Sequence, residues 1–509
     1  MDRDVSAVSR RALLRRGALA LFGSAAAAAL AACGAPLPTP VVPTQAPAKP
    51  TEVPKSADAA KPTEAAKPAD AAKPTEAAKP AAAATKPAGT APEAAKPVTA
   101  APGQVVLRMH ARTDAEGTKP KAAIKVVEEK NPKIKVVEEN IPGGEFIPKV
   151  LAMAAGDQLG DLIWGSPTNY HIQVGTGLWY DVTPLIKSSN YDLKPFFSSA
   201  IDYLTKHDGK FWSLPYKAHP GGAALWYNKE MLEKEGFANP APKSYDELAE
   251  MAVKLTKRPA GGGPVEVYGF LPFDSYDHQT LGMHRAFGVE EVDPIFGAKK
   301  SLVDQPKSLE MFTWLHSLYH KHKVAAIPGP GIGVGQDTWV AQKAAMYQAS
   351  SSTKGAEPAI GGKFTPRNVL MPPGPAGKIG TKLVFDNFGM YAKTKNPNEA
   401  FEVLGYFCGK EHGIRLGLPE GGGSWTCGAR TDVFYSDELM KSTPNHKIFA
   451  EITEKADPSF YPENFRLNEY ATTLTQEYQK IMLNETPPTA ATMKQLQQGL
   501  QAVLDRPKP

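Results

Sequence analysis

The side chains best spaced for metal chemistry are three histidines, His316, His320 and His322. The first two are four residues apart, so on a helix their imidazoles would share one face, as zinc ligands do. No Asp, Glu or Cys completes the set at a zinc-site spacing. Apolar residues between positions 314 and 319 mark the buried side of the same helix, which places the histidines on its solvent-facing side. We therefore expect no metal and no other cofactor.

Catalytic motifs of fixed spacing are missing from the sequence. It contains neither Gly-x-Ser-x-Gly nor His-Glu-x-x-His, and the glycine-rich stretches 329–335 and 374–378 do not fit the dinucleotide-binding or Walker A spacing. A glycoside hydrolase needs two carboxylates that face one cleft, and nothing selects a pair among the 53 acidic residues. We expect a chain that is not an enzyme, with a cell-surface glycoside hydrolase left open as an alternative.

The thiol with the most informative context is Cys33, which follows Leu30-Ala31-Ala32. Arginines at positions 10, 11, 15 and 16 precede an apolar run over 17–32, which is too short for a ~30 Å bilayer core at about 1.5 Å per residue. Leu30-Ala31-Ala32-Cys33 resembles a bacterial lipoprotein lipobox, and residues 9–15 resemble a twin-arginine export signal. This implies that residues 1–32 are a cleaved signal peptide, with diacylglycerol on Cys33 and the protein anchored on the outer face of the cell membrane. An ordinary secretory signal with an incidental cysteine is the alternative.

Residues 33–103 hold the lipidated cysteine and a linker rich in Lys, Pro and Ala. Lys-Pro recurs every six residues from position 61 to position 80. So much proline denies both helix and sheet, and the linker has no aromatic residue with which to build a core. We expect a disordered tether with a reach on the order of 50 Å.

The charge balance separates this leader and tether from the rest of the chain. Of the 58 basic and 53 acidic residues, the first 103 hold 13 and 8, which leaves 45 of each in the remainder. Because that remainder is formally neutral, we expect no nucleic-acid partner.

The remaining stretch of about 405 residues is long enough for two lobes of about 200 residues each. Its two cysteines, Cys408 and Cys427, could form a disulfide or remain two free thiols. Residues 105–109, 134–137 and 161–164 are apolar runs typical of buried strands, and they alternate with helical patterns that end at Asn131-Pro132 and at Gly156. This order predicts a mostly parallel sheet in an α/β fold, with ligands outside the carboxyl ends of the strands.

Several blocks resemble the extracellular solute-binding proteins of ABC sugar importers, the class that includes maltose-binding protein. The most specific blocks are 208–216 (DGKFWSLPY), 225–230 (LWYNKE) and 242–248 (PKSYDEL), in the order and spacing of that family. Residues 339–346 (WVAQKAAM) resemble a helix and turn of the family, with Gln342 where glycine is usual. Together the matching blocks cover nearly all of residues 105–490.

The resemblance implies a two-lobed periplasmic-binding-protein-like fold with a hinge. The first lobe would comprise residues 104–218 and 384–430, and the second 219–383 and 431–509. Crossings between lobes are expected after Tyr216, where residues 217–222 supply adaptable backbone, between Val384 and Asn387, and around Arg430. A surface turn is the alternative for Pro220-Gly221-Gly222.

A sugar needs flat aromatic side chains for its apolar face and fixed polar groups for its hydroxyls. Trp212 and Trp226 lie in strand-like runs and are expected in the core, whereas Trp164 and Trp425 adjoin glycine. By position in the matched blocks, the expected ligand contacts are Trp164, Ser166, Asn169, Tyr216, His219, Asp274, Tyr276, Ser350, Asn387, Phe388 and Trp425.

The resulting expectation is a lipid-anchored, monomeric receptor that captures an extracellular carbohydrate, in particular an oligosaccharide, and delivers it to an ABC permease. The alternatives among binding proteins are a glycerol-phosphate ester, which would require Arg or a helix amino terminus in the cleft, and a polyamine, which would require acids and aromatic walls.

Overall fold

The computed structural model describes residues 101–113, 115–272, 280–327, 335–418, 426–459 and 462–507. The predicted lipid-anchor cysteine Cys33, the signal peptide and nearly all of the tether lie outside these ranges. None of the described helices is long and apolar enough to cross a membrane.

The first strands and helices follow the alternation that the sequence predicts. β1 pairs in parallel with β2 on one side and with β3 on the other. The second helix ends at Gly156, whose backbone N–H bonds back to the last turn. The elements are β1 (Val105–His110), α3 (Ala115–Lys130), β2 (Ile134–Glu138), α4 (Phe146–Ala155) and β3 (Leu162–Gly165).

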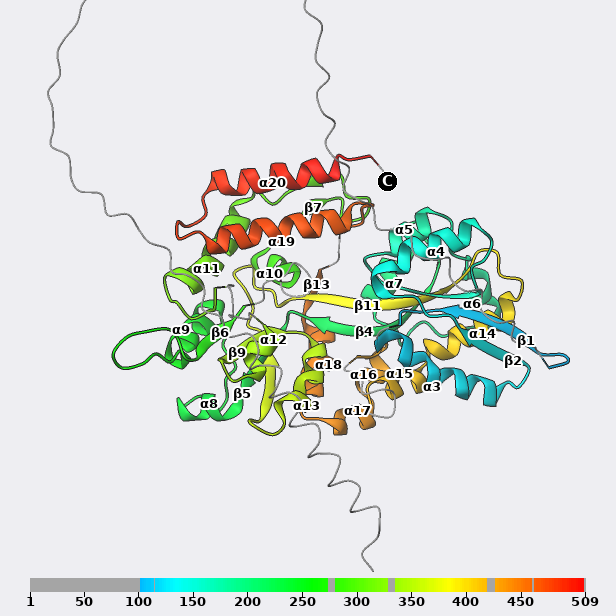
Figure 1. Cartoon of the computed structure of the whole chain (residues 1–509), viewed down its shortest axis with the longest axis horizontal. Helices are drawn as coiled ribbons and strands as arrows, with labels where there is room; N and C mark the ends of the chain where they lie inside the picture. The colour runs from blue at the N-terminus through cyan, green and yellow to red at the C-terminus, as the bar shows by residue number, and fades with distance from the viewer. Residues whose placement is uncertain are drawn as a thin grey trace, which may run out of the picture. The chain divides into compact units, whose positions relative to one another are not determined.

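These strands belong to a seven-stranded sheet of order β12-β4-β11-β3-β1-β2, with β13 paired to β11. Helices cover the sheet on both sides (Figure 1). The additional strands are β4 (Leu214–Gly221), β11 (Gly380–Met390), β12 (Cys427–Gly428) and β13 (Asp457–Ser459), and the helices are α5 (Tyr170–Gly175), α6 (Thr183–Ser189), α7 (Ser198–Thr205), α14 (Pro397–Phe407) and α15 (Lys410–Leu416).

A second, four-stranded sheet has the order β10-β5-β9-β6. Its strands are β5 (Ala224–Asn228), β6 (Tyr268–Leu271), β9 (Ala344–Ala349) and β10 (Pro366–Leu370), and β7 (Val292–Asp293) pairs with β8 (Lys300–Ser301) nearby. The remaining helices are α8 (Lys229–Lys234), α9 (Tyr245–Leu255), α10 (Leu281–Phe287), α11 (Pro306–His320), α12 (Gln336–Val340), α13 (Glu357–Ile360), α16 (Thr431–Phe434), α17 (Asp437–Ser442), α18 (His446–Lys455), α19 (Leu467–Leu483) and α20 (Ala490–Leu504).

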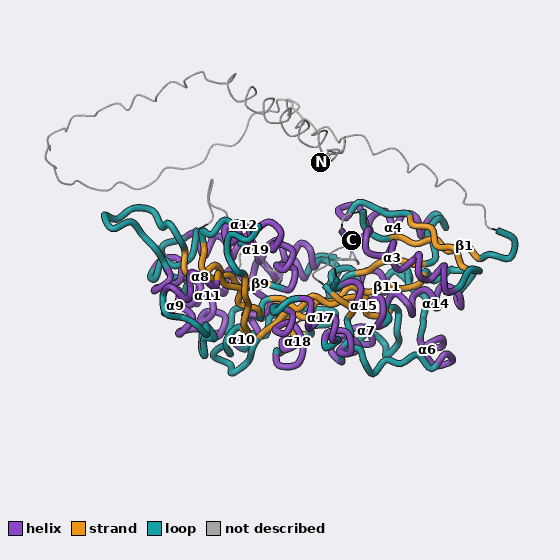
Figure 2. The backbone as a smooth tube through the Cα atoms, turned by 90° about the horizontal axis from the view of Figure 1, so that it is seen from below, coloured by secondary structure: helices purple, strands orange, loops and turns teal. Residues whose placement is uncertain are grey.

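The two sheets define a two-lobed α/β fold, and β4 and β11 connect them. β11 pairs with β3 at its carboxyl end and antiparallel to β4 along most of its length, with a register shift between Asp386 and Asn387. β4 leads through Gly222, at φ 77°, directly into β5 of the other sheet. Both strands run between the two groups of elements (Figure 1), and β11 is seen in the same place in Figure 2. We refer to this antiparallel pair as the β4–β11 ribbon.

The structure corrects two expectations about individual segments. The surface turn considered for residues 220–222 is wrong, because Pro220 and Gly221 are buried within β4. Trp226 is fully buried as predicted. Trp212, however, is only partly buried, and its indole Nε1 donates a hydrogen bond to Asp208 Oδ1 at 3.1 Å.

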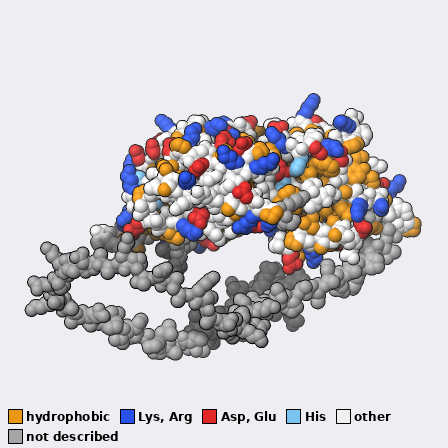
Figure 3. Space-filling view, turned by 90° about the horizontal axis from the view of Figure 1, so that it is seen from above, with side chains coloured by type: hydrophobic (Ala, Val, Ile, Leu, Met, Phe, Trp, Pro, Cys, Tyr) orange, Lys and Arg blue, Asp and Glu red, His pale blue; other side chains and the backbone are white. Residues whose placement is uncertain are grey.

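The described residues form three apolar core clusters, and one of them joins Ala218 and Phe385 of the seven-stranded sheet to Trp226 of the four-stranded sheet. Another joins β1, β3 and α14, and the third gathers α9, α10 and α11 with the carboxyl-terminal helices α19 and α20. Cys408 and Cys427 are buried free thiols, which resolves the alternative left open by the sequence. On the face shown in Figure 3, basic and acidic side chains are interspersed.

Candidate functional site

The indole of Trp164 lies at the carboxyl end of β3, where the parallel sheet presents its edge. Its ring meets Phe146 edge-on at 5.3 Å, and the Arg112 guanidinium lies 5.4 Å from its centroid. Its Nε1 donates a hydrogen bond to Asp386 Oδ2 at 3.3 Å. Because only 4% of Trp164 is exposed, this tryptophan joins β3 to β11 and offers little free surface in this structure.

Asp386 is also the centre of a buried charge cluster on the β4–β11 ribbon. Lys217 Nζ lies 2.9 Å from Asp386 Oδ2, and the side chains are 2% and 7% exposed. Lys382 is buried on the same strand as Asp386, and burial holds its pKa well below the usual range while Asp386 opposes that shift. Taking such charges out of water is costly, so they persist only where they are paired and held in place.

Strand alternation places the members of this cluster on one face of the ribbon. Asp386 is directly opposite Lys217, and Phe388 is opposite Trp164, so side chains two residues apart along β11 share that face. Phe385, opposite Ala218, points to the other face and meets the Tyr203 ring of α7 at 5.4 Å. The ribbon therefore has a charged face and an apolar face.

Ser166 and Asn169 follow Trp164 at the same sheet edge. Ser166 Oγ lies 2.8 Å from Thr168 Oγ1, and Asn169 Nδ2 donates to Ser166 Oγ at 3.2 Å. Together they form a small polar loop at the amino end of α5. Of the expected ligand contacts, this loop and Trp164 are brought close together.

Two other expected contacts, Tyr216 and Phe388, are buried in the interior of the protein. Tyr216 is buried, and its hydroxyl lies 3.3 Å from His412 Nε2. Phe388 is fully buried against Tyr216 and Phe407, with ring centroids 4.9 and 5.4 Å apart. Neither aromatic ring offers a surface to a ligand in this structure.

Asn387 and Ser350 occupy separate positions on the ribbon and β9. Asn387 is fully buried on the face opposite Trp164, where its Oδ1 lies close to Gly165. Ser350 follows β9, and its backbone carbonyl accepts a hydrogen bond from Trp226 Nε1 at 3.2 Å. Asn387 thus pairs with the residue that precedes the Ser166–Asn169 loop, whereas Ser350 follows a strand of the other sheet.

The remaining expected contacts are His219, Asp274, Tyr276 and Trp425. The backbone of His219 lies within β4, paired with Val384. Asp274, Tyr276 and Trp425 lie outside the described residues.

The structure adds residues that sequence reasoning missed. Arg112 follows the carboxyl end of β1, and Trp164 lies at the carboxyl end of β3, so the expectation that ligands collect at these strand ends applied to Arg112 as well. Lys217 and Lys382 interrupt otherwise apolar runs, and a lysine within a buried strand was a usable signal for a functional cluster.

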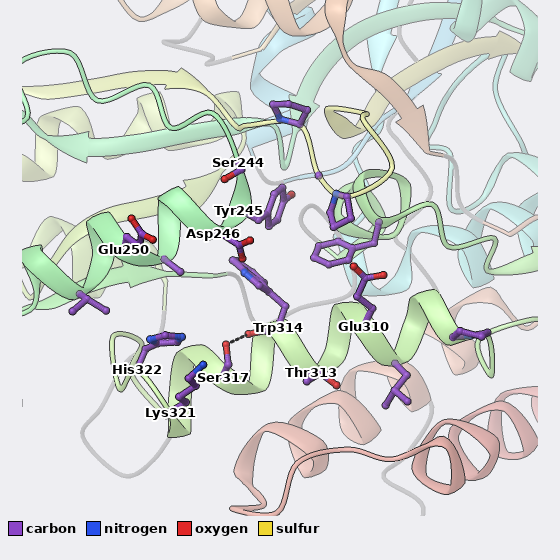
Figure 4. A pocket seen from close by; sticks show the side chains of 18 of the residues that line it. Ser244, Tyr245, Asp246, Glu250, Glu310, Thr313, Trp314, Ser317, Lys321 and His322 are labelled. Atoms are coloured by element: carbon purple, nitrogen blue, oxygen red, sulfur yellow. Dashed lines mark hydrogen bonds between the residues drawn. The ribbon is translucent and has the colours of Figure 1, made fainter.

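A groove of about 1260 Å³ lies elsewhere, between α9 and α11 (Figure 4). Tyr245, Phe287 and Trp314 form a ring cluster there, with Tyr245 and Trp314 centroids 4.9 Å apart. The groove contains none of the expected ligand contacts and does not reach the ribbon. We therefore do not assign the solute site to it.

His316 and His320 serve a structural purpose at the end of α19. His316 Nε2 lies 2.8 Å from the carbonyl oxygen of Asn484, and His320 Nε2 lies 2.8 Å from that of Met482. These imidazoles satisfy carbonyls that the helix end leaves unpaired. The expectation that both face solvent is wrong for His316, which is buried. Among the described residues, no group of three His, Cys, Asp or Glu could hold a metal ion.

Residues 114–413 match the sequence profile of the bacterial extracellular solute-binding proteins. A probable ABC transporter-binding protein of Deinococcus radiodurans is 26% identical over 260 residues, which is 49% of this chain and 57% of that protein. The chain thus spans little more than half the length of this curated relative.

Solved structures show the same fold at low identity. An ABC substrate-binding protein of Listeria monocytogenes, in complex with cycloalternan, has a TM-score of 0.64 at 17% identity, over 78% of this chain and 98% of its own. A cyclic α-maltosyl-1,6-maltose binding protein of Arthrobacter globiformis has a TM-score of 0.65 at 17% identity, over 79% of this chain and 99% of its own.

Proposed function

The chain belongs to the family of bacterial extracellular solute-binding proteins, and we propose that it captures an extracellular carbohydrate, in particular an oligosaccharide, for an ABC permease. Members of this family bind solutes and are not enzymes, which removes the glycoside hydrolase alternative.

The observation that carries this proposal is the β4–β11 ribbon with its charged face. Its strands connect the two sheets, and the Ser166–Asn169 loop lies at the carboxyl edge of β3 beside it. We propose that residues 104–218 and 384–430 form the first lobe, that 219–383 and 431–509 form the second, and that the solute binds on the charged face between them. Ligand that contacts both lobes would stabilise their closed arrangement by its differential affinity.

The choice of carbohydrate is supported by the solutes named for proteins of the same fold, cycloalternan and cyclic α-maltosyl-1,6-maltose. An aromatic side chain that covers roughly 100 Å² of a sugar contributes about 2 to 3 kcal/mol. Trp425 and Tyr276 remain the proposed aromatic contacts, and Ser166, Asn169, His219 and Asp274 the proposed polar ones. We propose that four buried residues hold the contacting side chains in place, namely Tyr216, Ser350, Asn387 and Phe388. Trp164 would form one wall of the site.

The anchor is proposed from the sequence. A diacylated Cys33 and a tether over 34–103 would hold the body on the outer face of the cell membrane as a monomer, within reach of the permease. Two or more acyl chains give a durable anchor, whereas a single chain binds only marginally.

A phosphate ester is the second candidate solute. The guanidinium of Arg112 stands beside Trp164, and Lys217 lies on the same face of the ribbon. Arginine at a strand edge suits phosphate recognition through charge-assisted hydrogen bonds.

A thermal-shift screen of the full chain distinguishes these candidates. Maltooligosaccharides and cyclic tetrasaccharides should raise the melting temperature, whereas glycerol phosphodiesters and polyamines should not. A shift produced only by the phosphodiesters would replace the carbohydrate by the second candidate. A shift produced only by the polyamines would refute both.

A further inference from the structure

The groove of about 1260 Å³ between α9 and α11 has an aromatic floor (Figure 4). Trp314 of α11 lines this groove and is partly exposed. Tyr245 and Phe287 are only 4% and 2% exposed, and their ring centroids lie 4.9 and 6.1 Å from that of Trp314. Because both supporting rings are buried, the indole is held in one orientation and presents a fixed aromatic surface to the groove.

One wall of the groove is the loop Pro373-Gly374-Pro375. The N–H of Gly374 donates to the carbonyl of Lys378 at 2.9 Å, and the N–H of Ala376 donates to the carbonyl of Ala286 at 3.0 Å. A Cβ at Gly374 would lie 2.4 Å from the Ala286 carbonyl oxygen, so glycine is needed where this loop meets α10. Proline fixes φ on both sides of this contact. The groove is therefore largely preformed, as small-molecule sites usually are.

The rim of the groove carries side chains of both charges. Asp246 and Glu250 belong to α9 and Glu310 to α11, whereas Lys254 and Lys321 lie at the carboxyl ends of these two helices. All five are exposed, and none of them forms an ion pair within the part of the chain that the structure describes. Glu310 and Lys321 lie toward opposite ends of the groove in Figure 4. Their separation in sequence corresponds to about 16 Å along a helix.

The mixed charge of the rim indicates which ligand fits. A polyamine would be repelled by Lys254 and Lys321, and a polyanion would be repelled by the three carboxylates. A hydroxyl group avoids both conflicts, since it can donate to a carboxylate and accept from an ammonium group. Trp314 adds the flat surface that the apolar C–H face of a sugar requires. A neutral carbohydrate combines these properties, and the groove is longer than a single sugar ring.

We propose that the α9–α11 groove is a second binding site, for a neutral oligosaccharide or polysaccharide chain. Trp314 stacks on the sugar, and Asp246, Glu310 and Lys321 bind its hydroxyl groups. The groove shares no residue with the proposed solute site, so this second site does not rest on the identity of the solute bound there. A polysaccharide held in the groove raises the local concentration of sugar around the receptor.

Native electrophoresis in gels that contain a soluble polysaccharide tests the groove in the full chain with Cys33→Ala. Starch, dextran and galactomannan are the neutral probes, and alginate is the anionic probe. At least one neutral probe should retard the parent, and alginate should not. Trp314→Ala should weaken binding about 10- to 100-fold, because the stacking surface is lost. Glu310→Ala, at an exposed position, should weaken it about two- to tenfold.

Trp212→Ala is the matched control, since Trp212 is another partly exposed tryptophan, and its indole bonds to Asp208 outside the groove. It should keep the retardation of the parent, and melting temperatures verify that each variant is folded. Equal retardation of the parent and a folded Trp314→Ala would overturn the site, as would retardation by no neutral probe. Retardation that spermidine abolishes would show a cation site and would also overturn it. If Trp314→Ala does not fold, the same comparison with Glu310→Ala decides.

The thermal shift that maltooligosaccharides should produce separates this site from the proposed function. That shift belongs to the proposed solute site and should persist in Trp314→Ala. A parent that is retarded in the gel but shows no such shift would contradict the proposed function and leave the groove as a carbohydrate site. A parent that shows the shift without retardation would do the reverse.

Discussion

Replacing Asp386 by Asn should destabilise the body strongly, because it removes a buried negative charge and keeps the shape of the side chain. Asp386 lies 2.9 Å from Lys217 Nζ and also opposes the depression of the Lys382 pKa. Losing one partner of a buried pair costs about 3 to 5 kcal/mol, since the remaining charge stays out of water. For lobes of about 200 residues this corresponds to a fall in melting temperature of about 6 to 20 °C.

Asp157 provides the matched control for this measurement. It pairs with Lys393, but the two side chains are 71% and 61% exposed, so Asp157→Asn should change the melting temperature by less than about 1 °C. Replacing both buried partners, in Lys217→Met with Asp386→Leu, should recover much of the loss. Calorimetric scans of the three variants at pH 7 provide the comparison. An Asp386→Asn variant that melts within about 2 °C of the parent would refute the assignment of Asp386 as the counter-charge of the ribbon.

Trp164→Ala should lower the free energy of unfolding by about 3 to 5 kcal/mol in chemical denaturation, because the indole is buried; an unaltered stability with weaker solute binding would instead make Trp164 a stacking surface. Cys33→Ala should leave a folded protein that is released or unprocessed, and its retention in the membrane fraction after leader removal would contradict the anchor. Gln342→Gly should raise stability by about 1 kcal/mol, since Gln342 adopts φ 60°, and a melting temperature at or below the parent value would argue against strain there. Burial raises the pKa of Cys408 and of Cys427, so a thiol reagent at pH 8 should react with both only after denaturation, and rapid reaction in the native state would show that they are accessible.

Local sequence patterns correctly predicted several strands and one helix end. The apolar runs at 105–109 and 134–137 are strands, and the helix begun at Phe146 ends at Gly156. Gln342, in the place of a usual glycine, adopts the left-handed conformation that such a glycine would allow. Each of these features is decided by residues within one or two turns of the chain.

What the sequence did not predict depends on partners far along the chain. The pairing of Lys217 with Asp386 requires the antiparallel register of β4 and β11, which no local pattern encodes. The same holds for His316, which the helical periodicity placed toward solvent. Its partner is the carbonyl of Asn484 at the end of α19, 168 residues later in the chain. A charged side chain inside an apolar run indicates that it has a partner, but it does not indicate which residue that partner is.

The ribbon leaves few places where the lobes can rotate. β4 and β11 are paired along most of their common length, so bending within the paired segments would break ladder hydrogen bonds. The register shift at Asn387 is the exception, and both amide atoms of this buried side chain lack a hydrogen-bond partner among the described residues. An unpaired buried amide group costs about 1 to 3 kcal/mol, which a rotation that supplied a partner would recover. A side chain at Gly165 would come within 2.3 Å of Asn387 Oδ1, so a residue without Cβ is needed beside it. We therefore expect the lobes to pivot at Asn387.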